Sequence, residues 1–270
     1  MTKGLSIVMP AFNEAEIIER TVVDCDRTIV SAFPAGEIIV VDDRSDDGTH
    51  ETVQKLRGQV AGLRIIRNRR NMGHGPSMLA GLRQARYDLV FCMDSDYQFP
   101  PDEFWKLHAM LEHADIVIGQ RKERNDPLHR KILSQGANFF TRALFDCKAK
   151  DLNIPFKLFR REKLNEVLRF IPRDALIPSI LIMTVACRMN LRIRQVPVKH
   201  LPRSTGRCSL PGKRLLIFSI KALYELLCFR NRLSHHPVNA PADRRNRDEG
   251  QVTIPCSDNR ERKKEPDAEK

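Results

Sequence analysis

The feature that most constrains the fold is an apolar run that ends in acidic residues and is followed by a helical pattern. Residues 38–41 are all apolar and lead into Asp42 and Asp43, after which apolar residues recur at helical spacing to about residue 56. Residues 90–93 lead into Asp94 and Asp96 in the same way. Runs without polar alternation, each followed by a helix, are typical of a parallel sheet with helices on both faces. The sequence therefore predicts an α/β fold with a mostly parallel central sheet.

The same alternation of strand and helix extends through most of the chain. We expect strands at residues 5–9, 37–43, 63–66, 90–93, 115–119, 158–159 and 191–198, and helices at residues 15–31, 45–56, 76–85, 104–112, 128–145, 176–189 and 214–229. Beyond the last helix the composition turns to Pro, Asn and charged residues without periodicity, which is typical of disorder. We therefore expect a domain at residues 1–212, an amphipathic helix at 213–230 and a disordered charged tail at 231–270. The amphipathic helix would lie either at a membrane surface or against the domain.

Positive charge is concentrated before the tail. The net charge is +12, and the nine basic and eight acidic residues of segment 231–270 account for only +1 of it. Residues 175–224 contain nine basic side chains and no acidic one. Such a stretch predicts a surface that faces a polyanion: a phosphorylated small molecule, an anionic membrane or a nucleic acid. One Trp and three Tyr offer few surfaces for stacking on bases, so we expect no nucleic-acid partner.

The cysteines and the N-terminus bear on the compartment. Seven cysteines are scattered without a C-x-x-C pair, which indicates reduced thiols in a cytosolic protein. The first residues lead directly into a strand without a signal peptide, and no apolar run approaches about 18 residues. With the basic stretch, this predicts a cytoplasmic protein that is peripheral at the cytosolic face of a membrane.

Acidic side chains collect where the predicted strands end. In a parallel sheet these ends meet at one edge, where the ligands of such folds bind. If the backbone stays extended, Asp94, Asp96 and Gln98 point the same way and converge on one divalent cation. Oxygen ligands of this kind suit Mg²⁺ or Mn²⁺ rather than zinc. Asp46 and Asp47, in contrast, have the position of helix-capping residues.

Seven short motifs follow one another in the chain. They are Pro-Ala-Phe-Asn-Glu at 10–14, Val-Asp-Asp-Arg-Ser-Asp-Asp-Gly-Thr at 41–49, Asn-Met-Gly-His-Gly at 71–75, Asp-Ser-Asp-Tyr-Gln-Phe-Pro-Pro at 94–101, Gly-Gln-Arg at 119–121, His-Arg-Lys-Ile-Leu-Ser at 129–134, and the stretch 197–209. In this order they resemble the family 2 glycosyltransferases, which have the nucleotide-sugar-binding GT-A fold. Within that family they look like the polyprenyl (dolichyl) phosphate mannosyl- and glucosyltransferases, over about residues 4–230. The D-x-D-x-Q form before Pro-Pro is the most specific motif.

The resemblance implies metal-dependent transfer of one sugar from a GDP- or UDP-linked donor to a polyprenyl phosphate. The departing nucleoside diphosphate develops negative charge, which a divalent cation and nearby basic groups stabilise. A phosphate acceptor is already a nucleophile, so no dedicated base is required, and His74 and His200 are expected to be structural or peripheral and not catalytic. By motif match, the nucleotide-sugar would be bound by Pro10, Phe12, Glu14, Asp42, Asp94 and Arg203, Mg²⁺ or Mn²⁺ by Asp94, Asp96 and Gln98, and the acceptor phosphate by Arg121, Arg130 and Ser134. Catalysis would depend most on Asp96 and Arg121.

Two positions depart from the pattern of the polyprenyl phosphate group. Pro155 replaces a glycine that is usual before the aromatic residue, and Ser209 stands where the group has a lysine, although Arg207 is close in sequence. Three alternatives stay open. The acceptor could be a soluble or cell-surface glycan, the protein could bind nucleotide-sugars without turning them over, or the charge could serve a nucleic-acid-binding module.

Overall fold

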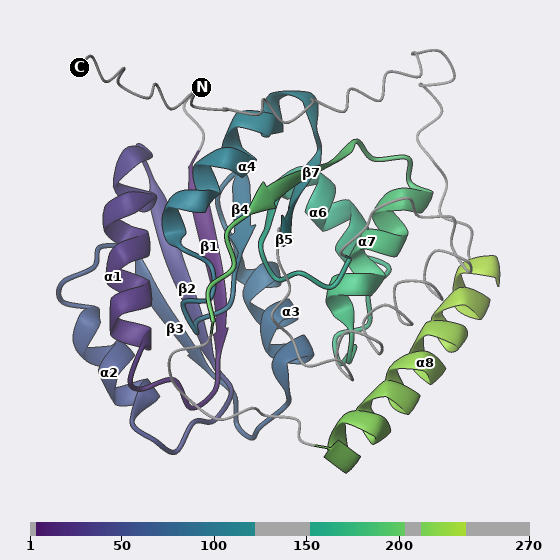
Figure 1. Cartoon of the computed structure of the whole chain (residues 1–270), viewed down its shortest axis with the longest axis horizontal. Coiled ribbons are helices and arrows are strands. Elements are labelled where there is room, and N and C mark those ends of the chain that lie inside the picture. The colour runs from purple at the N-terminus through teal and green to yellow at the C-terminus, as the bar shows by residue number, and fades with distance from the viewer. Residues whose placement is uncertain (1–3, 122–151, 203–211, 236–270) are drawn as a thin grey trace, which may run out of the picture. The chain divides into compact units, whose positions relative to one another are not determined.

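The computed structural model describes residues 4–121, 152–202 and 212–235, and in these ranges seven strands form one sheet (Figure 1). The strand order is β3-β2-β1-β4-β6-β5-β7. The strands are β1 (Leu5–Ala11), β2 (Gly36–Asp42), β3 (Leu63–Arg67), β4 (Leu89–Cys92), β5 (Ile116–Arg121), β6 (Lys157–Arg160) and β7 (Ile193–Val198). Neighbouring strands of this sheet are parallel except at β6, which runs antiparallel to both β4 and β5. The predicted mostly parallel sheet is confirmed.

Helices cover both faces of the sheet (Figure 1). On one face lie α1 (Ile18–Thr28), α2 (Thr49–Leu56) and α4 (Phe104–Met110), and on the other lie α3 (His74–Gln84), α6 (Arg161–Leu168) and α7 (Pro178–Arg188). The indole N–H of Trp105 in α4 donates to the carbonyl of Thr28 at the end of α1, 3.2 Å away. The last helix, α8 (Gly212–His235), packs at the margin of the fold through its own apolar face.

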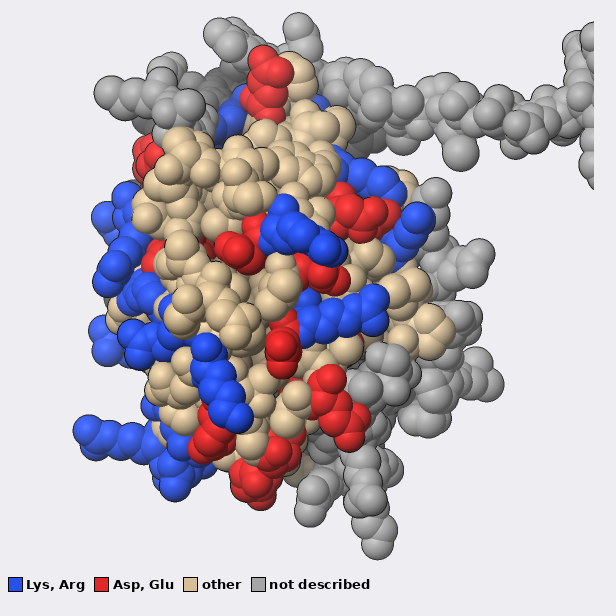
Figure 2. All heavy atoms as spheres, turned by 90° about the vertical axis from the view of Figure 1, so that its left-hand side faces the viewer, with Lys and Arg blue, Asp and Glu red and all other residues tan. Residues whose placement is uncertain are grey.

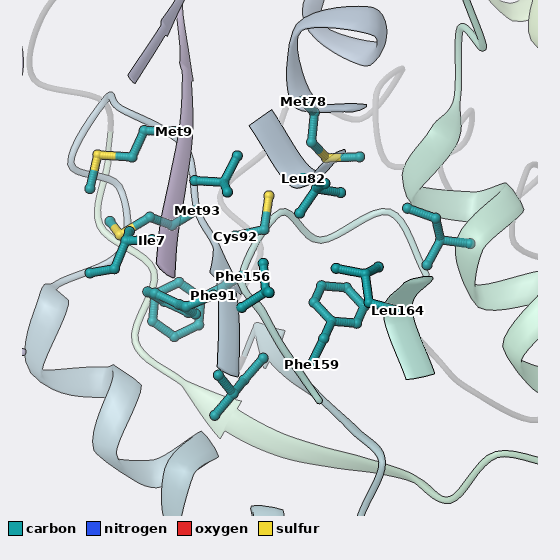
Figure 3. Close-up of a cluster of buried hydrophobic side chains, with 14 of the residues drawn as sticks. Ile7, Met9, Met78, Leu82, Phe91, Cys92, Met93, Phe156, Phe159 and Leu164 are labelled. Atoms are coloured by element: carbon teal, nitrogen blue, oxygen red, sulfur yellow. The ribbon is translucent and has the colours of Figure 1, made fainter. Parts of the chain in front are cut away.

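The core lies where the sheet meets these helices (Figure 3). The strands are buried along their whole length in the centre of the sheet, because their side chains are apolar on both faces. Phe91 of β4 contacts the rings of Phe104 and Phe156 at centroid distances of 5.0 and 4.8 Å, in edge-to-face geometry. This cluster anchors β4, so the residues that directly follow the strand start from a rigid support.

The structure departs from the sequence-based expectation at four places. Helix α6 was not predicted, although its inward residues Leu164, Val167 and Leu168 have helical spacing. Helix α8 continues to His235, so the predicted tail begins too early; Leu233 is 1% exposed and extends the packed face by another turn. Cys187 is disulfide-bonded, which contradicts the expectation that all cysteines are reduced, since spacing alone does not reveal pairing. The fourth difference is at Asp94–Gln98, where the chain turns and does not continue as an extended strand.

Two other expectations concern helices. The helix predicted at residues 128–145 lies outside the described residues. No helix in the described part of the chain is long and apolar enough to span a bilayer.

Candidate active site

The sheet sorts charged residues by sign along one edge. Because β1, β2, β4, β5 and β7 run the same way and β6 runs against them, the carboxyl ends of the first five and the amino end of β6 share that edge. Side by side after β2, β1 and β4 come Asp42 and Asp43, Glu14, and then Asp94 and Asp96. Next along the sheet come Lys157 of β6, Arg121 of β5 and Lys199 after β7. The predicted gathering of acidic strand ends is confirmed, and a basic half follows it along the sheet. Arg67, at the end of the neighbouring β3, is a basic residue on the acidic side.

The loops after β1 and β2 are tied together by hydrogen bonds. The backbone N–H of Asn13 donates to the hydroxyl of Ser45 at 3.0 Å, and the N–H of Glu14 donates to the hydroxyl of Thr49 at 2.9 Å. Asp47 accepts from the N–H groups of Ala15 and Thr49, both at 3.0 Å. Partial burial acts to raise the pKa of Asp47, but the hydrogen bond from the Thr49 hydroxyl and these two backbone bonds prevail and lower it. The N-cap of α2 is Gly48, so the predicted capping role of Asp47 is not confirmed; its carboxylate instead accepts from both loops and holds them together.

Asp42 and Asp43 lie at the end of β2 in different settings. Asp42 is fully buried; its Oδ1 accepts from the N–H of Ser45 at 2.9 Å, and its Oδ2 lies 3.0 Å from Arg67 Nε. His50 Nδ1 is 3.4 Å from the same oxygen. A nucleotide contact by Asp42, as the motif match implies, would therefore share this carboxylate with Arg67.

Asp43 organises the glycine-rich turn that leads into α3. It accepts from the N–H groups of Met72 and Gly73, at 2.8 and 2.7 Å, and from the side-chain amide of Asn68 at 2.7 Å. Gly73 has a φ of 90°, which only glycine adopts without strain, and so the chain can turn here directly into the helix. The sequence had not indicated this role for Asp43.

The segment Asp94–Gln98 is a turn and not an extended strand. Strand β4 ends at Cys92, and Tyr97 has a φ of 59°, in the left-handed region. The period-two argument for three side chains pointing the same way was therefore wrong, because it required extended backbone through Gln98. Asp96 is 8% exposed and its Oδ1 accepts from the N–H of Gln98 at 3.2 Å. This bond closes the turn, with Asp94 and Asp96 on its first half.

The residues of this turn fit a hard divalent cation. Asp94 Oδ1 is buried and has no hydrogen-bond partner among the residues that the structure describes, and His74 Nε2 is 3.7 Å from it. The side-chain amide N–H of Gln98 donates to the carbonyl of Leu201 at 3.3 Å, so the side-chain oxygen Oε1 is the atom of Gln98 that would serve as a ligand. Within the described residues no three His, Cys, Asp or Glu side chains are grouped to hold a metal by themselves. A cation here would complete its shell with substrate oxygens and water, as Mg²⁺ commonly does.

Tyr97, which sequence reasoning missed, fixes the turn to α1. Its hydroxyl donates to Asp24 Oδ2 at 2.6 Å, and the guanidinium of Arg20 lies 4.2 Å from the centre of its ring. The thiol of Cys25 in the same helix contacts Met93 Sδ at 3.5 Å. Helix α1 thus supports the acidic turn through these contacts. In the sequence, the aromatic residue between the second Asp and the Gln of D-x-D-x-Q was the only signal of this support.

The basic half of the edge begins directly beside the acidic turn. Lys157, another residue that the sequence did not single out, pairs with Cys92 across β4 and β6, is 3% exposed, and donates to Ser179 Oγ and to the carbonyl of Ile154. Arg121 ends β5, with its guanidinium 6.0 Å from the centre of the Phe99 ring. The ring of His200 lies 5.0 Å from the same phenyl ring. Phe99 is therefore close to both Arg121 and His200.

The other predicted nucleotide residues lie at the end of β1. Pro10 is buried and its carbonyl accepts from the hydroxyl of Ser95 at 3.0 Å, while Phe12 is 39% exposed and Glu14 is 8% exposed. The structure thus brings Pro10 next to the acidic turn. Arg130, Ser134 and Arg203 lie outside the described residues, so their placement stays a prediction.

Comparison with known proteins decides the family. Residues 6–168 match glycosyl transferase family 2. The chain belongs to this family. It is therefore a glycosyltransferase, and its fold is that of the GT-A enzymes.

Individual relatives and structures agree with this assignment. The chain is 29% identical over 232 residues to the undecaprenyl-phosphate 4-deoxy-4-formamido-L-arabinose transferase of Salmonella choleraesuis. The aligned region covers 83% of this chain and 67% of the relative. The Salmonella newport protein of the same name shows the same identity and coverage. Among solved structures, glucosyl-3-phosphoglycerate synthase from Mycobacterium tuberculosis, in complex with Mn²⁺, UDP-glucose and phosphoglyceric acid, has a TM-score of 0.64 at 22% identity, over 85% of this chain and 80% of that one.

Proposed function

We propose that this glycosyltransferase transfers one sugar from a nucleotide-diphosphate sugar to a polyprenyl phosphate, with Mg²⁺ or Mn²⁺ as cofactor. The observation that carries the proposal is the turn after β4, which contains both Asp94 and Asp96. A buried oxygen of Asp94 has no hydrogen-bond partner there within the described ranges. A carboxylate oxygen without a donor is costly to bury unless a cation or donor joins it.

The donor half of the proposal rests on the acidic strand ends. Asp94, Asp96 and Gln98 would hold the cation, which neutralises charge on the departing nucleoside diphosphate. Pro10, Phe12, Glu14 and Asp42 would contact the nucleotide, and Arg203 its diphosphate. Solved structures of the same fold contain Mn²⁺ together with UDP-glucose, which supports a divalent cation and a UDP-linked donor, while a GDP-linked donor stays an alternative.

The acceptor half rests on the basic side of the edge and on the relatives. Proteins 29% identical over 232 residues are named as transferases to undecaprenyl phosphate. A phosphate monoester suits the basic half of the edge, where Arg121 would contact it and would share the catalytic role with Asp96. Arg130 and Ser134 complete the proposed phosphate site. The phosphate oxygen attacks the anomeric carbon while the bond from that carbon to the nucleotide diphosphate breaks, and the sugar ends on the lipid phosphate.

A substrate screen with matched variants tests the proposal. Purified full-length protein is incubated with UDP- and GDP-sugars, a short polyprenyl phosphate and Mn²⁺ or Mg²⁺, and the products are identified by mass spectrometry. We expect sugar-phospholipid product with one donor series, its loss with EDTA, and at least a 100-fold lower rate in Asp96→Asn. Asp102→Asn, an exposed carboxylate in the neighbouring 3₁₀ turn, is the control and should keep the wild-type rate.

The same screen separates the alternatives. Transfer to soluble glycans but not to polyprenyl phosphate would replace the lipid acceptor with a glycan. Donor binding without any product would indicate a nucleotide-sugar-binding protein without activity. A wild-type rate in Asp96→Asn would refute the assignment of the cation site.

A further inference from the structure

Helix α8 has two apolar faces, and only one of them is packed. The packed face consists of Leu226, Phe229 and Leu233, which are 3%, 3% and 1% exposed. Around the other side of the helix, Ile217, Ile220, Leu223, Tyr224 and Leu227 are 54%, 60%, 40%, 70% and 47% exposed. Helical spacing of three and four places Ile217, Ile220, Tyr224 and Leu227 in one stripe opposite the packed face. A single helix with large apolar side chains on its solvent side requires a further contact to bury them.

The charges around this stripe all have one sign among the described side chains of α8. Lys221, Arg230 and Arg232 are exposed beside it. The acidic residue of this segment, Glu225, is turned to the packed side, where its carboxylate accepts from the N–H groups of Leu176 and Ile177 at 2.9 and 3.0 Å. By contrast, basic and acidic side chains are interspersed over the face that carries α1 and α2 (Figure 2).

A second arginine outside the helix extends the basic flank. Arg169, next to the end of α6, and Arg232 together line a cavity of about 290 Å³ whose other lining residues are Phe170 and Leu233. Two arginines and two apolar residues thus line the same cavity. Guanidinium groups pair well with phosphate oxygens, so this edge of α8 suits the headgroup level of a phospholipid layer.

We propose that α8 binds the surface of an anionic lipid bilayer, with its exposed apolar stripe among the acyl chains and its basic flank at the headgroups. An apolar stripe bordered by Lys and Arg is the pattern of helices that lie in the membrane interface. The absence of acidic groups along the described exposed face favours an anionic surface over a protein partner of mixed charge. This inference does not depend on the proposed sugar transfer, because it uses none of the residues assigned to that site.

Vesicle binding by the full chain tests the inference. Co-sedimentation is measured with vesicles of phosphatidylcholine alone and of phosphatidylcholine with phosphatidylglycerol. We expect strong binding to the anionic vesicles, weakened by 0.5 M salt, and at least about tenfold weaker binding in the double variant Ile220→Gln with Tyr224→Gln. Lys221→Glu should weaken binding to anionic vesicles about fivefold or more. Because all three side chains are exposed, the melting temperature of these variants should match that of the wild type.

Matched substitutions elsewhere serve as controls. Met72→Gln changes another apolar side chain, 42% exposed and outside α8, and Lys55→Glu reverses an exposed charge in α2. Both should bind vesicles like the wild type. Absence of vesicle binding by the wild type overturns the inference, as does equal binding by the α8 double variant. Light scattering that shows a dimer dissociated by Ile220→Gln, without vesicle binding, would assign the stripe to a second copy of the chain and overturn it as well.

Discussion

Replacing Tyr97 tests whether the shape of the acidic turn sets its affinity for a cation. Tyr97 has a φ of 59°, and the left-handed region costs a residue with a side chain about 1–2 kcal/mol. The hydrogen bond to Asp24 at 2.6 Å and the contact with Arg20 at 4.2 Å offset this cost. Tyr97→Phe keeps the ring over Arg20 and removes only the hydrogen bond. For a hydrogen bond to a charged acceptor the net loss is about 1.5–3 kcal/mol, so we expect a loss near the lower end at this partly buried position.

That loss should be visible in both stability and cation affinity. For a domain of this size a loss of about 1.5 kcal/mol lowers the melting temperature by roughly 3–6 °C. If half of it loosens the turn, the cation concentration at half-maximal transfer rises about three- to fourfold, since 1.4 kcal/mol corresponds to tenfold. The rate at saturating cation should stay within about twofold, because the carboxylates are unchanged. Burial and the neighbouring Asp24 raise the pKa of Tyr97, so the bond is present throughout the neutral range in which the assay is run.

Tyr87→Phe is the matched control for this experiment. Tyr87 is also half-buried, but it lies before β4, and its hydroxyl makes no hydrogen bond within the described residues. The same deletion of one oxygen should therefore leave the cation response at its wild-type value. Equal cation responses in Tyr97→Phe, Tyr87→Phe and the wild type would refute the reasoning, because the turn would then keep its shape without the contact to α1.

Three further predictions concern the support of the site. Gly75→Ala should destabilise the protein by about 1–3 kcal/mol in urea unfolding, since a Cβ there would lie 2.5 Å from the carbonyl oxygen of Ala175, whereas Gly58→Ala, with open space around it, should be neutral or slightly stabilising. Asp47→Asn should destabilise the protein at pH 7. The pKa of Asp47 is lowered on folding, so its contribution to stability is present above the pKa of the unfolded chain and is lost as the pH falls through the pKa of the folded protein. The difference in stability between variant and wild type should therefore shrink below about pH 4. Glu225→Gln should lower the melting temperature, because the start of α7 would lose a charged acceptor, and the helical signal in circular dichroism should be retained below the transition.

The strands could be predicted because burial on both faces leaves a continuous apolar run in the sequence. Helix α6 escaped prediction because five of its eight residues are polar or charged, and only Leu164, Val167 and Leu168 are buried. The antiparallel direction of β6 cannot be predicted from its four residues. It follows from pairing with β4 and β5, which are more than 35 residues away in the chain. Local pattern thus identifies elements, while strand order and direction depend on contacts that no local pattern contains.

The candidate site could be predicted where it consists of strand ends, and not where it depends on distant contacts. Asp42, Asp94 and Asp96 were found because acidic residues after apolar runs are visible in the sequence. The contact of Tyr97 with Asp24 spans 73 positions, and that of Lys157 with Ser179 spans 22. A Tyr or a Lys at such a position does not indicate its partner in the sequence. The roles of Tyr97 and Lys157 therefore became visible only in the fold.

The order of the strands in the sheet, and not their order in the chain, gives the site its polarity. The acidic ends of β2, β1 and β4 are neighbours, and the basic residues of β6, β5 and the segment after β7 follow them. The border runs between β4 and β6, where Cys92 is paired with Lys157, and burial raises the pKa of the Cys92 thiol to about 12, so that it adds no charge there. A donor diphosphate that brings a divalent cation is suited to the acidic side, and an acceptor phosphate without a cation is suited to the basic side. The proposed glycosidic bond would then form at the border, with each phosphate group kept on its own side by the sign of the charge beneath it.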